Sequence, residues 1–251
     1  MPWVLDLDGV VWLADEPIAG SAQAVEALRG RGERVVFVTN NSAATVAEQE
    51  AKLAAHGIPA AGDVVSSAAV TAGLLQPGER VLVAGGAGLV EAVHARGCEV
   101  VAGDGRDPGG VDAVVVGLHR DFDYARLERA SAAVRAGARL LASNDDATYP
   151  TPRGPVPGAG SILAAVERAS GARAVVAGKP YAPMAEHLRA RLGPDGTVVG
   201  DRPDTDGALA RRMGWRFALV LSGVTADASR ADPAPDVVAG DLSSLVRAEP
   251  R

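Results

Sequence analysis

Lysine is scarce in this sequence. Of its 25 basic side chains only Lys52 and Lys179 are lysine, and the others are arginine. Lys179 lies in the stretch VVAGKPYAPM, between an apolar run and a proline. An ammonium is a compact point charge, whereas a guanidinium is a wide planar fork that prefers two partners at once. A lysine at this position therefore indicates either chance on a surface loop or a site that needs one compact charge.

Other absences exclude whole classes of protein. The one cysteine, Cys98, cannot form an internal disulfide, which fits a reducing compartment and predicts a cytoplasmic protein. No apolar run approaches the length of a membrane span, and the start, MPWVLDLDGV, lacks the features of a signal peptide. The net charge of −6 argues against nucleic-acid binding, which needs a basic face. We therefore expect neither a membrane nor a nucleic-acid partner.

Aromatic residues make up only 4% of the chain, so the core must be built from Val, Leu and Ala. Short Val-rich runs without polar alternation are typical of strands in a sheet that is covered on both faces. They occur at 3–7, 34–38, 80–84, 111–117, 138–143, 174–178, 196–200 and 216–221. Ala-rich helical stretches lie between them, at 21–30, 44–56, 88–96, 123–136, 160–170, 181–192 and 204–213. This alternation predicts an α/β fold with parallel strands.

The middle of the chain differs from the rest in its polar residues. Residues 79–172 have their own alternation of strands and helices and lie between two turn-forming stretches, LQPGE and ASGAR. This organisation predicts a Rossmann-like parallel-sheet core domain, 1–78 and 173–251, with an α/β domain inserted at 79–172. The inserted part contains VLVAGGAGLVEAV, which is glycine-rich like a dinucleotide site, but Glu91 occupies the third glycine position. We interpret that run as a tight strand-to-helix turn.

Two carboxylates end the first predicted strand. Asp6 and Asp8 lie two residues apart, so their side chains lean the same way if the backbone stays extended. Two acids this close repel each other unless a cation lies between them or a pKa shifts. An Asp-Gly turn is the simpler explanation, but Asp6 directly follows an apolar run, where a carboxylate without a partner is unfavourable. The pair indicates a cation site.

Further polar runs follow other predicted strands. Thr39, Asn40 and Asn41 precede a helical stretch, where they would either cap the helix or present a hydroxyl and N–H groups to a phosphate. Asp201 and Asp206 lie in GDRPDTD, directly after another strand. In an open parallel sheet, ligands bind beyond the carboxyl ends of the strands. We therefore expect these runs to meet the first acidic pair and the lysine at one crevice.

The charges at this crevice favour a divalent cation. Four carboxylates face the single ammonium of Lys179, and a phosphate dianion cannot enter such a field unaided. Oxygen ligands suit Mg²⁺, which takes few carboxylates and leaves room for a substrate phosphate. One ammonium can touch both a phosphate oxygen and a carboxylate, where a guanidinium would crowd the site. The sequence thus predicts a Mg²⁺ site and a functional Lys179.

The motifs DLDGVVW, FVTNNS, AGKP and GDRPDTD, in this order, resemble those of the haloacid dehalogenase (HAD) superfamily of phosphohydrolases. More narrowly they resemble its NagD-like branch, which includes 4-nitrophenylphosphatases, phosphoglycolate phosphatases and glycerol-phosphate phosphatases. The resemblance implies a Mg²⁺-dependent phosphatase that hydrolyses small phosphomonoesters through an aspartyl-phosphate intermediate. It also implies that the inserted domain is a cap. Within the superfamily, dehalogenases lack an acid at the position of Asp8.

The resemblance implies catalytic and metal-binding residues. Asp6 would be the nucleophile that takes the phosphoryl group. Asp8 would protonate the leaving alcohol and then deprotonate the water that hydrolyses the intermediate. Mg²⁺ would be held by the Asp6 and Asp201 carboxylates and by the backbone carbonyl of Asp8.

The resemblance also implies residues that bind the phosphoryl group. Thr39 and the Asn40 backbone, followed by Asn41, would contact its oxygens, and Lys179 would neutralise them. Asp206 would orient Lys179 or the waters of the metal.

The cap is expected to close over the crevice and contact the leaving group. The candidates in NDDATYPTPRGPVPGAGS are Asn144, Asp145, Asp146 and Arg153, although such residues are common in ordinary loops. The small cap predicts a small phosphorylated metabolite as substrate. The sequence PTPRGPVPG resembles glycerol-phosphate phosphatases most, while phosphoglycolate, sugar phosphates and nucleoside monophosphates remain open as substrates. Self-association through the cap is also left open.

Three other functions agree with parts of this sequence. A binding protein on the same scaffold would hold a phosphorylated ligand without turnover, but it is expected to lack Asp6, Asp8 or Lys179. The hypothesis of a nucleotide-dependent oxidoreductase rests on the glycine-rich run VLVAGGAGLVEAV, which Glu91 interrupts. A phosphomutase shares the aspartyl-phosphate but usually has a smaller cap inserted directly after the first motif.

Overall fold

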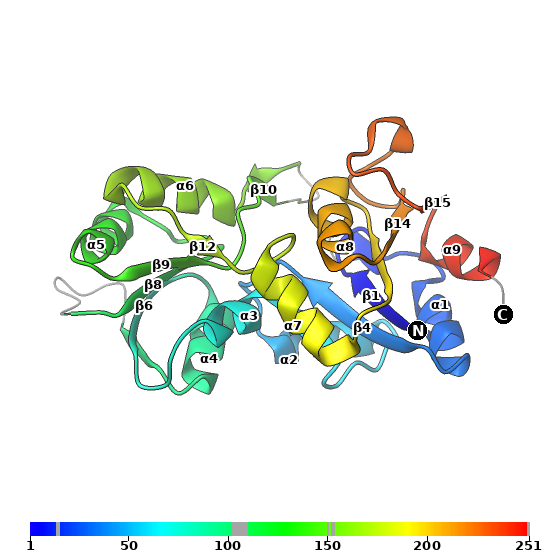
Figure 1. The fold of residues 1–251 in the computed structure, drawn as a ribbon, viewed down its shortest axis with the longest axis horizontal. Coiled ribbons are helices and arrows are strands. Elements are labelled where there is room, and N and C mark those ends of the chain that lie inside the picture. The colour runs from blue at the N-terminus through cyan, green and yellow to red at the C-terminus, as the bar shows by residue number, and fades with distance from the viewer. Residues whose placement is uncertain (14–15, 102–109, 150, 152–153, 250–251) are drawn as a thin grey trace. The chain divides into compact units, whose positions relative to one another are not determined.

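The computed structural model describes residues 1–13, 16–101, 110–149, 151 and 154–249. The chain divides into two compact units, whose elements are labelled in Figure 1. The first unit consists of Met1–Thr39, Ala47–Val65 and Lys179–Arg251, and the second of Asn40–Val46 and Ser66–Gly178. Within the described part of the chain, no helix has the length and hydropathy needed to span a membrane.

The first unit is a parallel sheet packed with helices. Its strands are β1 (Pro2–Asp6), β4 (Arg34–Thr39), β5 (Val64–Ser66), β13 (Thr197–Gly200), β14 (Arg216–Val220) and β15 (Val237–Ala239). Its helices are α1 (Ser21–Gly30), α2 (Val46–Ala55), α7 (Ala182–Leu192), α8 (Ala208–Met213) and α9 (Leu242–Ala248). The strand order is β15-β14-β13-β1-β4-β5. The pairs of β1 with β4 and β13, and of β14 with β13 and β15, are parallel.

The position of β1 in the middle of this sheet creates the site. Its residues Trp3, Val4 and Leu5 are buried, because helices cover the sheet and leave only apolar surroundings. Because β1 lies between β4 and β13, Asp6 and Thr39 end two adjacent parallel strands, and Asp201 directly follows the third. Polar residues at these three points therefore face the same edge of the sheet.

Smaller elements complete the first unit. A hairpin of β2 (Trp12–Leu13) and β3 (Glu16–Pro17) follows β1. A wide helical turn, Pro203–Gly207, leads directly into α8, and a single tight turn covers Ala228–Arg230. The wide turn brings the GDRPDTD stretch back toward β13, from which it has just emerged.

The second unit is also a parallel sheet with helices. Its strands are β6 (Arg80–Ala84), β7 (Glu99–Val101), β8 (Ala113–Val116), β9 (Arg139–Ala142) and β12 (Val175–Val176). Its helices are α3 (Ser67–Gly73), α4 (Ala87–Ala95), α5 (Tyr124–Arg135) and α6 (Ala159–Ser170). The strand order is β12-β9-β8-β6-β7, with parallel pairing throughout. A short antiparallel hairpin joins β10 (Thr148–Tyr149) to β11 (Val156–Pro157).

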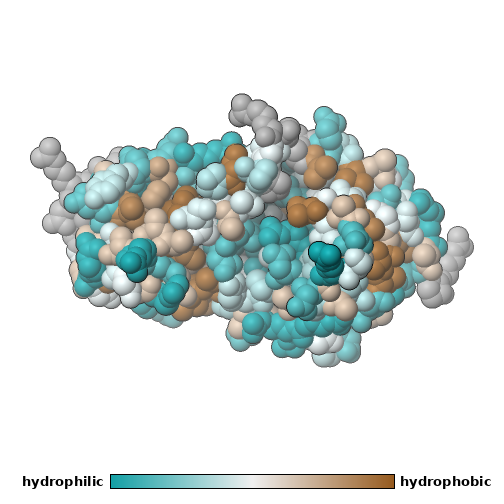
Figure 2. Space-filling model, turned by 90° about the horizontal axis from the view of Figure 1, so that it is seen from above, coloured by the Kyte–Doolittle hydropathy of each residue, from teal (hydrophilic) through white to brown (hydrophobic). Residues whose placement is uncertain are grey.

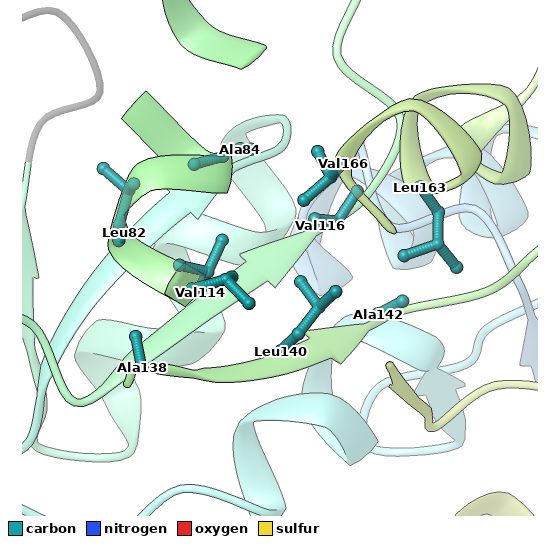
Figure 3. Packing of buried hydrophobic residues seen from close by; sticks show 12 residues of the cluster. Leu82, Ala84, Val114, Val116, Ala138, Leu140, Ala142, Leu163 and Val166 are labelled. Carbon is teal, nitrogen blue, oxygen red and sulfur yellow. The ribbon is translucent and has the colours of Figure 1, made fainter. Parts of the chain in front are cut away.

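Both faces of this second sheet are covered. On one face Leu82, Val114 and Leu140 pack with Leu163 and Val166 of α6, as Figure 3 shows. The residues next to them in the sequence point to the opposite face, where they pack with α3 and α4. This two-sided burial explains why the strand sequences are apolar without alternation.

The predicted α/β fold class is confirmed, since parallel strands alternate with helices in both units. One expectation about the crevice is wrong. The run at 174–178 was expected beside the strands that end in Asp6, Thr39 and Gly200, but β12 pairs with β9 in the sheet of the second unit. The chain returns to the first unit directly after this run, at Lys179.

Candidate active site

A buried lysine joins two of the acidic motifs. The Nζ atom of Lys179 lies 2.7 Å from Oδ1 of Asp6 and 2.7 Å from Oδ1 of Asp206. Lys179 is only 3% exposed and Asp206 is fully buried. A surface ion pair contributes little, whereas a buried charge without its partner is strongly destabilising. Lys179 is therefore no chance residue on a surface loop, because its ammonium is the charge that two buried carboxylates share.

The third acid comes from the end of β13. Asp201 is 1% exposed, and its Oδ2 accepts a 2.6 Å hydrogen bond from the backbone N–H of Val224. Asp206 returns to the same place in the wide turn, where its Oδ2 accepts from the backbone N–H of Arg202 at 3.2 Å. The Val224 contact was not predicted from the sequence.

These carboxylates fit a hard metal cation. Asp6, Asp201 and Asp206 each offer an oxygen, and the three atoms lie within 4.8 Å of one another. The other oxygen of Asp201, Oδ1, is buried, and no hydrogen-bond donor in the described chain reaches it. A buried carboxylate oxygen of this kind is unfavourable unless a cation binds it. The all-oxygen donor set matches what Mg²⁺ prefers.

The pKa values of the acids reflect their burial and mutual repulsion. Burial, followed by the charges of Asp6 and Asp206, raises the pKa of Asp201 to about 7. Burial also raises the pKa of Asp206 to about 6, although the Lys179 charge opposes that rise. The pKa of Asp6 is raised for the same reason. Burial alone would lower the pKa of Lys179, but its two carboxylate partners outweigh burial and keep the ammonium charged.

Glycines leave the space in which the carboxylates sit. A Cβ on Gly9 would lie 2.4 Å from Oδ2 of Asp201, and one on Gly223 would lie 2.0 Å from the same atom. A Cβ on Gly200 would lie 2.1 Å from the Asp206 carboxylate. Gly9 also has a φ of +86°, which favours glycine over any other residue. Any side chain at these three positions would displace an acid from the site.

Asp8 and Thr39 occupy the positions expected at this edge of the sheet. Asp8 is half-buried, and its Oδ1 accepts a 3.1 Å hydrogen bond from the indole Nε1 of Trp12. Thr39 ends β4 and is 2% exposed. Trp12 ends the DLDGVVW motif, but no pattern in the sequence indicated that its indole would reach Asp8.

Other predicted residues lie in the second unit. The backbone carbonyl of Asn40 accepts from the Asn144 side chain at 2.7 Å and from the Ser67 hydroxyl at 3.0 Å. The Asn40 amide donates to Oδ2 of Asp146 at 3.2 Å. Asn144 is 3% exposed and its Oδ1 accepts from the Asp146 backbone, so its amide is engaged at both ends.

Asn41, Asp145 and Arg153 are the remaining residues predicted for the site. Asn41 is half-buried, and its Oδ1 accepts from the backbone N–H of Ala43 at 3.0 Å, as in a capping residue. Asp145 is exposed. Arg153 lies outside the described residues.

Comparison with known proteins connects this geometry to a family. Residues 3–99 match haloacid dehalogenase-like hydrolases, and residues 176–245 match a second family described as HAD-hydrolase-like. The D-glycerol 3-phosphate phosphatase of Mycobacterium tuberculosis is 40% identical over 252 residues, covering 96% of this chain and 70% of that protein. The chain belongs to the haloacid dehalogenase-like hydrolases.

Solved structures of HAD hydrolases match the fold. A p-nitrophenyl phosphatase from Archaeoglobus fulgidus superposes with a TM-score of 0.91 at 29% identity, covering 99% of this chain and 98% of that one. A glycerol phosphate phosphatase from Mycobacterium tuberculosis, crystallised with magnesium, has a TM-score of 0.87 at 39% identity, covering 97% and 75% of the chains. The predicted family and the predicted enzyme class, a phosphoric monoester hydrolase, are thereby confirmed.

Proposed function

We propose that the chain is a Mg²⁺-dependent phosphatase that hydrolyses small phosphomonoesters through an aspartyl-phosphate on Asp6. The buried carboxylate cluster around Lys179 carries the proposal. Its three acids and one ammonium leave an oxygen of Asp201 with no protein donor among the described residues, at the edge where ligands of parallel sheets bind. A bound cation balances the negative charge of the carboxylates, and a bound phosphate in turn balances the positive charge of the cation and of Lys179.

The first step transfers the phosphoryl group to the protein. Asp6 attacks phosphorus with one carboxylate oxygen while the bond to the leaving alcohol breaks. The Asp8 carboxyl gives its proton to the leaving oxygen, so that an alcohol departs in place of an alkoxide. Lys179 offsets the phosphoryl charge, and Thr39 and the backbone after it hold the phosphoryl oxygens.

The second step returns Asp6 to its initial state. A water molecule gives a proton to Asp8 and attacks the aspartyl-phosphate, and the bond between Asp6 and phosphorus breaks to release inorganic phosphate. The Asp6 and Asp201 carboxylates and the Asp8 backbone carbonyl would hold Mg²⁺, which would supply charge neutralisation to the phosphoryl group. Asp206 keeps Lys179 in place, since it bonds the same ammonium as Asp6.

The second unit serves as the cap in this proposal and selects the leaving group. Glycerol 3-phosphate is the first candidate substrate, because the relative with 40% identity is named for it and the sequence PTPRGPVPG resembles glycerol-phosphate phosphatases. Phosphoglycolate is the second candidate substrate. Asp145, which is exposed, is a better candidate for contact with substrate than Asn144, whose amide is already hydrogen-bonded at both ends. Arg153 stays a prediction from sequence.

The rival functions have less support. A binding protein without turnover is not favoured, because the nucleophile, the acid and the lysine are all present. The glycine run that suggested a dinucleotide site has a packing role instead. A Cβ on Gly86 would lie 2.8 Å from Cα of Ala43, and one on Gly88 would lie 2.1 Å from the carbonyl oxygen of Ala44. These glycines let α4 approach the backbone of the 43–44 segment.

The proposal also covers the cellular location of the protein, its partners and its self-association. A cytoplasmic location is supported by the single buried cysteine, Cys98. The absence of nucleic-acid and membrane partners is supported by the net negative charge and by the face in Figure 2, where hydrophobic residues form small separate areas among hydrophilic ones. Self-association through the second unit is testable by comparing the sedimentation mass of the full chain across a concentration series.

Phosphate release tests the reaction. Glycerol 3-phosphate, phosphoglycolate and 4-nitrophenyl phosphate would each be assayed with Mg²⁺, with a chelator, and with the Asp6→Asn variant. We expect release only with Mg²⁺, and a loss of at least about 10⁴-fold in Asp6→Asn, because an amide cannot act as the nucleophile. Turnover that survives in Asp6→Asn would contradict an aspartyl-phosphate. Ligand-induced stabilisation without any turnover would instead support the binding protein.

A further inference from the structure

The segment after β1 folds back on itself. The backbone N–H groups of Val11 and Trp12 both point to the carbonyl of Leu7, at 2.9 and 3.2 Å, and the Gly9 N–H donates to the Trp12 carbonyl at 2.6 Å. This compact turn brings the Trp12 side chain to Asp8, four residues earlier, where its Nε1–H donates to Oδ1. Trp12 is 2% exposed, so the indole is held by packing as well as by this bond.

The second lysine of the chain lies against the same indole. Nζ of Lys52, in α2, is 4.3 Å from the centroid of the Trp12 ring. The His56 ring, one helical turn further, lies 5.9 Å from it by centroids. A cation over the face of an indole is attracted by the ring electrons and draws density from the ring, which makes the N–H a stronger donor. Lys52 therefore supports the bond that Trp12 makes to Asp8.

We infer that Trp12, supported by Lys52, is a positioning residue that orients the Asp8 carboxyl for proton transfer to the leaving group and from the attacking water. The inference rests on the proposed function, in which Asp8 is the acid and base. An N–H donor on Oδ1 fixes the plane of the carboxyl and assigns the transferable proton to Oδ2. A carboxyl that rotates would present its proton in the right direction only part of the time, and misplacement is costly in proton transfer.

The leaving group provides a readout that a purely structural residue would not change. An alkoxide leaves only if it is protonated, whereas 4-nitrophenolate is a stable anion that departs with little help. Loss of Asp8 orientation should therefore slow hydrolysis of an alkyl phosphomonoester more than hydrolysis of 4-nitrophenyl phosphate. General damage to the fold would lower both rates together, because it reduces the amount of active enzyme.

The test uses Trp12→Phe, which keeps an aromatic ring but removes the N–H. We expect kcat/KM for glycerol 3-phosphate to fall about tenfold, with a much smaller fall for 4-nitrophenyl phosphate. This parameter reports the steps up to phosphoryl transfer to Asp6, whereas hydrolysis of the aspartyl-phosphate is common to both esters. Trp215→Phe is the matched control, because Trp215 is also 2% exposed in the first unit and donates its Nε1–H to the Pro194 carbonyl at 2.7 Å. The control should leave the ratio of the two kcat/KM values unchanged.

Variants of Lys52 refine the test. Lys52→Met should change the same ratio in the same direction by about two- to fivefold, and Lys52→Arg should restore most of it, because a guanidinium also stacks on an indole. A ratio that is unchanged in Trp12→Phe, or that shifts equally in Trp215→Phe, overturns the inference while the phosphatase activity stands. Wild-type enzyme that releases no phosphate from either ester overturns the proposed function itself.

Discussion

The two units share an architecture, a parallel sheet packed with helices, but they differ in what they bury. Among the described residues, the buried polar side chains of the second unit are all neutral: Ser42, Ser66, Ser67, Thr71, Ser131, Ser143 and Asn144. The first unit buries Lys179, Asp201 and Asp206 as well as neutral groups. The same kind of scaffold therefore carries neutral hydrogen bonds in one unit and a charge cluster in the other.

This difference shows that the electrostatically unfavourable arrangement of side chains lies in the unit that carries the candidate active site. Neutral buried groups need only hydrogen-bond partners, as the Ser42 and Ser143 hydroxyls of the second unit show by bonding each other at 2.8 Å. Buried charges need opposite charges, and three acids around one ammonium remain undercompensated until a cation binds. The first unit thus depends on its ligands for electrostatic balance, whereas the second does not.

The largest effect is expected from removing the ammonium of Lys179, which is buried between Asp6 and Asp206. Lys179→Met leaves Asp6 and Asp206 without their partner and should lower the free energy of unfolding by about 3–5 kcal/mol, as well as abolishing phosphate release. Chemical denaturation measures the loss. Adding Asp206→Asn to this variant should recover part of the stability, because it removes one of the unpaired charges. A double variant no more stable than Lys179→Met alone would show that the ion pair does not govern stability here.

A smaller effect, dependent on pH, is expected from the metal. Because the pKa of Asp201 is raised to about 7, the folded metal-free protein binds more protons than the unfolded chain between about pH 4 and pH 7. Its stability should therefore fall as pH rises through this range. Mg²⁺ binds the ionised carboxylates, so its stabilising effect should be larger at pH 8 than at pH 5.5.

Melting temperatures in Mg²⁺ and in chelator, at both pH values, measure this effect. Burial lowers the pKa of His119 and His187, so these groups add stability as pH rises and oppose the trend. The informative quantity is therefore the difference between wild type and Asp201→Asn. An equal Mg²⁺ shift at both pH values in the wild type would contradict the assignment of Asp201 as a metal ligand.

The smallest effect is expected from the neutral network of the second unit. Ser67→Ala removes one of two donors to the Asn40 carbonyl and should cost about 1 kcal/mol of stability, since the Asn144 amide still satisfies it. Ser131→Ala is the matched control, because this buried serine also donates to a backbone carbonyl, that of Leu127. Both losses should be independent of Mg²⁺ in urea denaturation. A Mg²⁺-dependent loss in Ser67→Ala alone would couple this network to the charge cluster.

Local patterns in the sequence were sufficient for much of the fold and the cluster. Apolar runs without alternation predicted covered parallel strands, and polar residues after those runs predicted which side chains would meet. Asp6, Asp201 and Asp206 do meet, around the Lys179 ammonium. Periodicity could not show which strand joins which sheet, so the run at 174–178 was placed with the wrong partners. Strand pairing depends on contacts between residues far apart in the chain, which no local pattern encodes.

The sequence by itself determined the class of fold, the acids and lysine of the cluster and the family that they resemble, because each depends on residue types in short, ordered motifs. Only the tertiary structure decided that Trp12 bonds Asp8, that Val224 bonds Asp201 and that glycines clear the space for the carboxylates. It also showed that Asn144 is engaged in holding the Asn40 backbone. The Val224 and Asn40 contacts join segments far apart in the chain, and such proximity exists only once the sheets have formed. Trp12 reaches Asp8 through a local turn, whose geometry no residue pattern signalled.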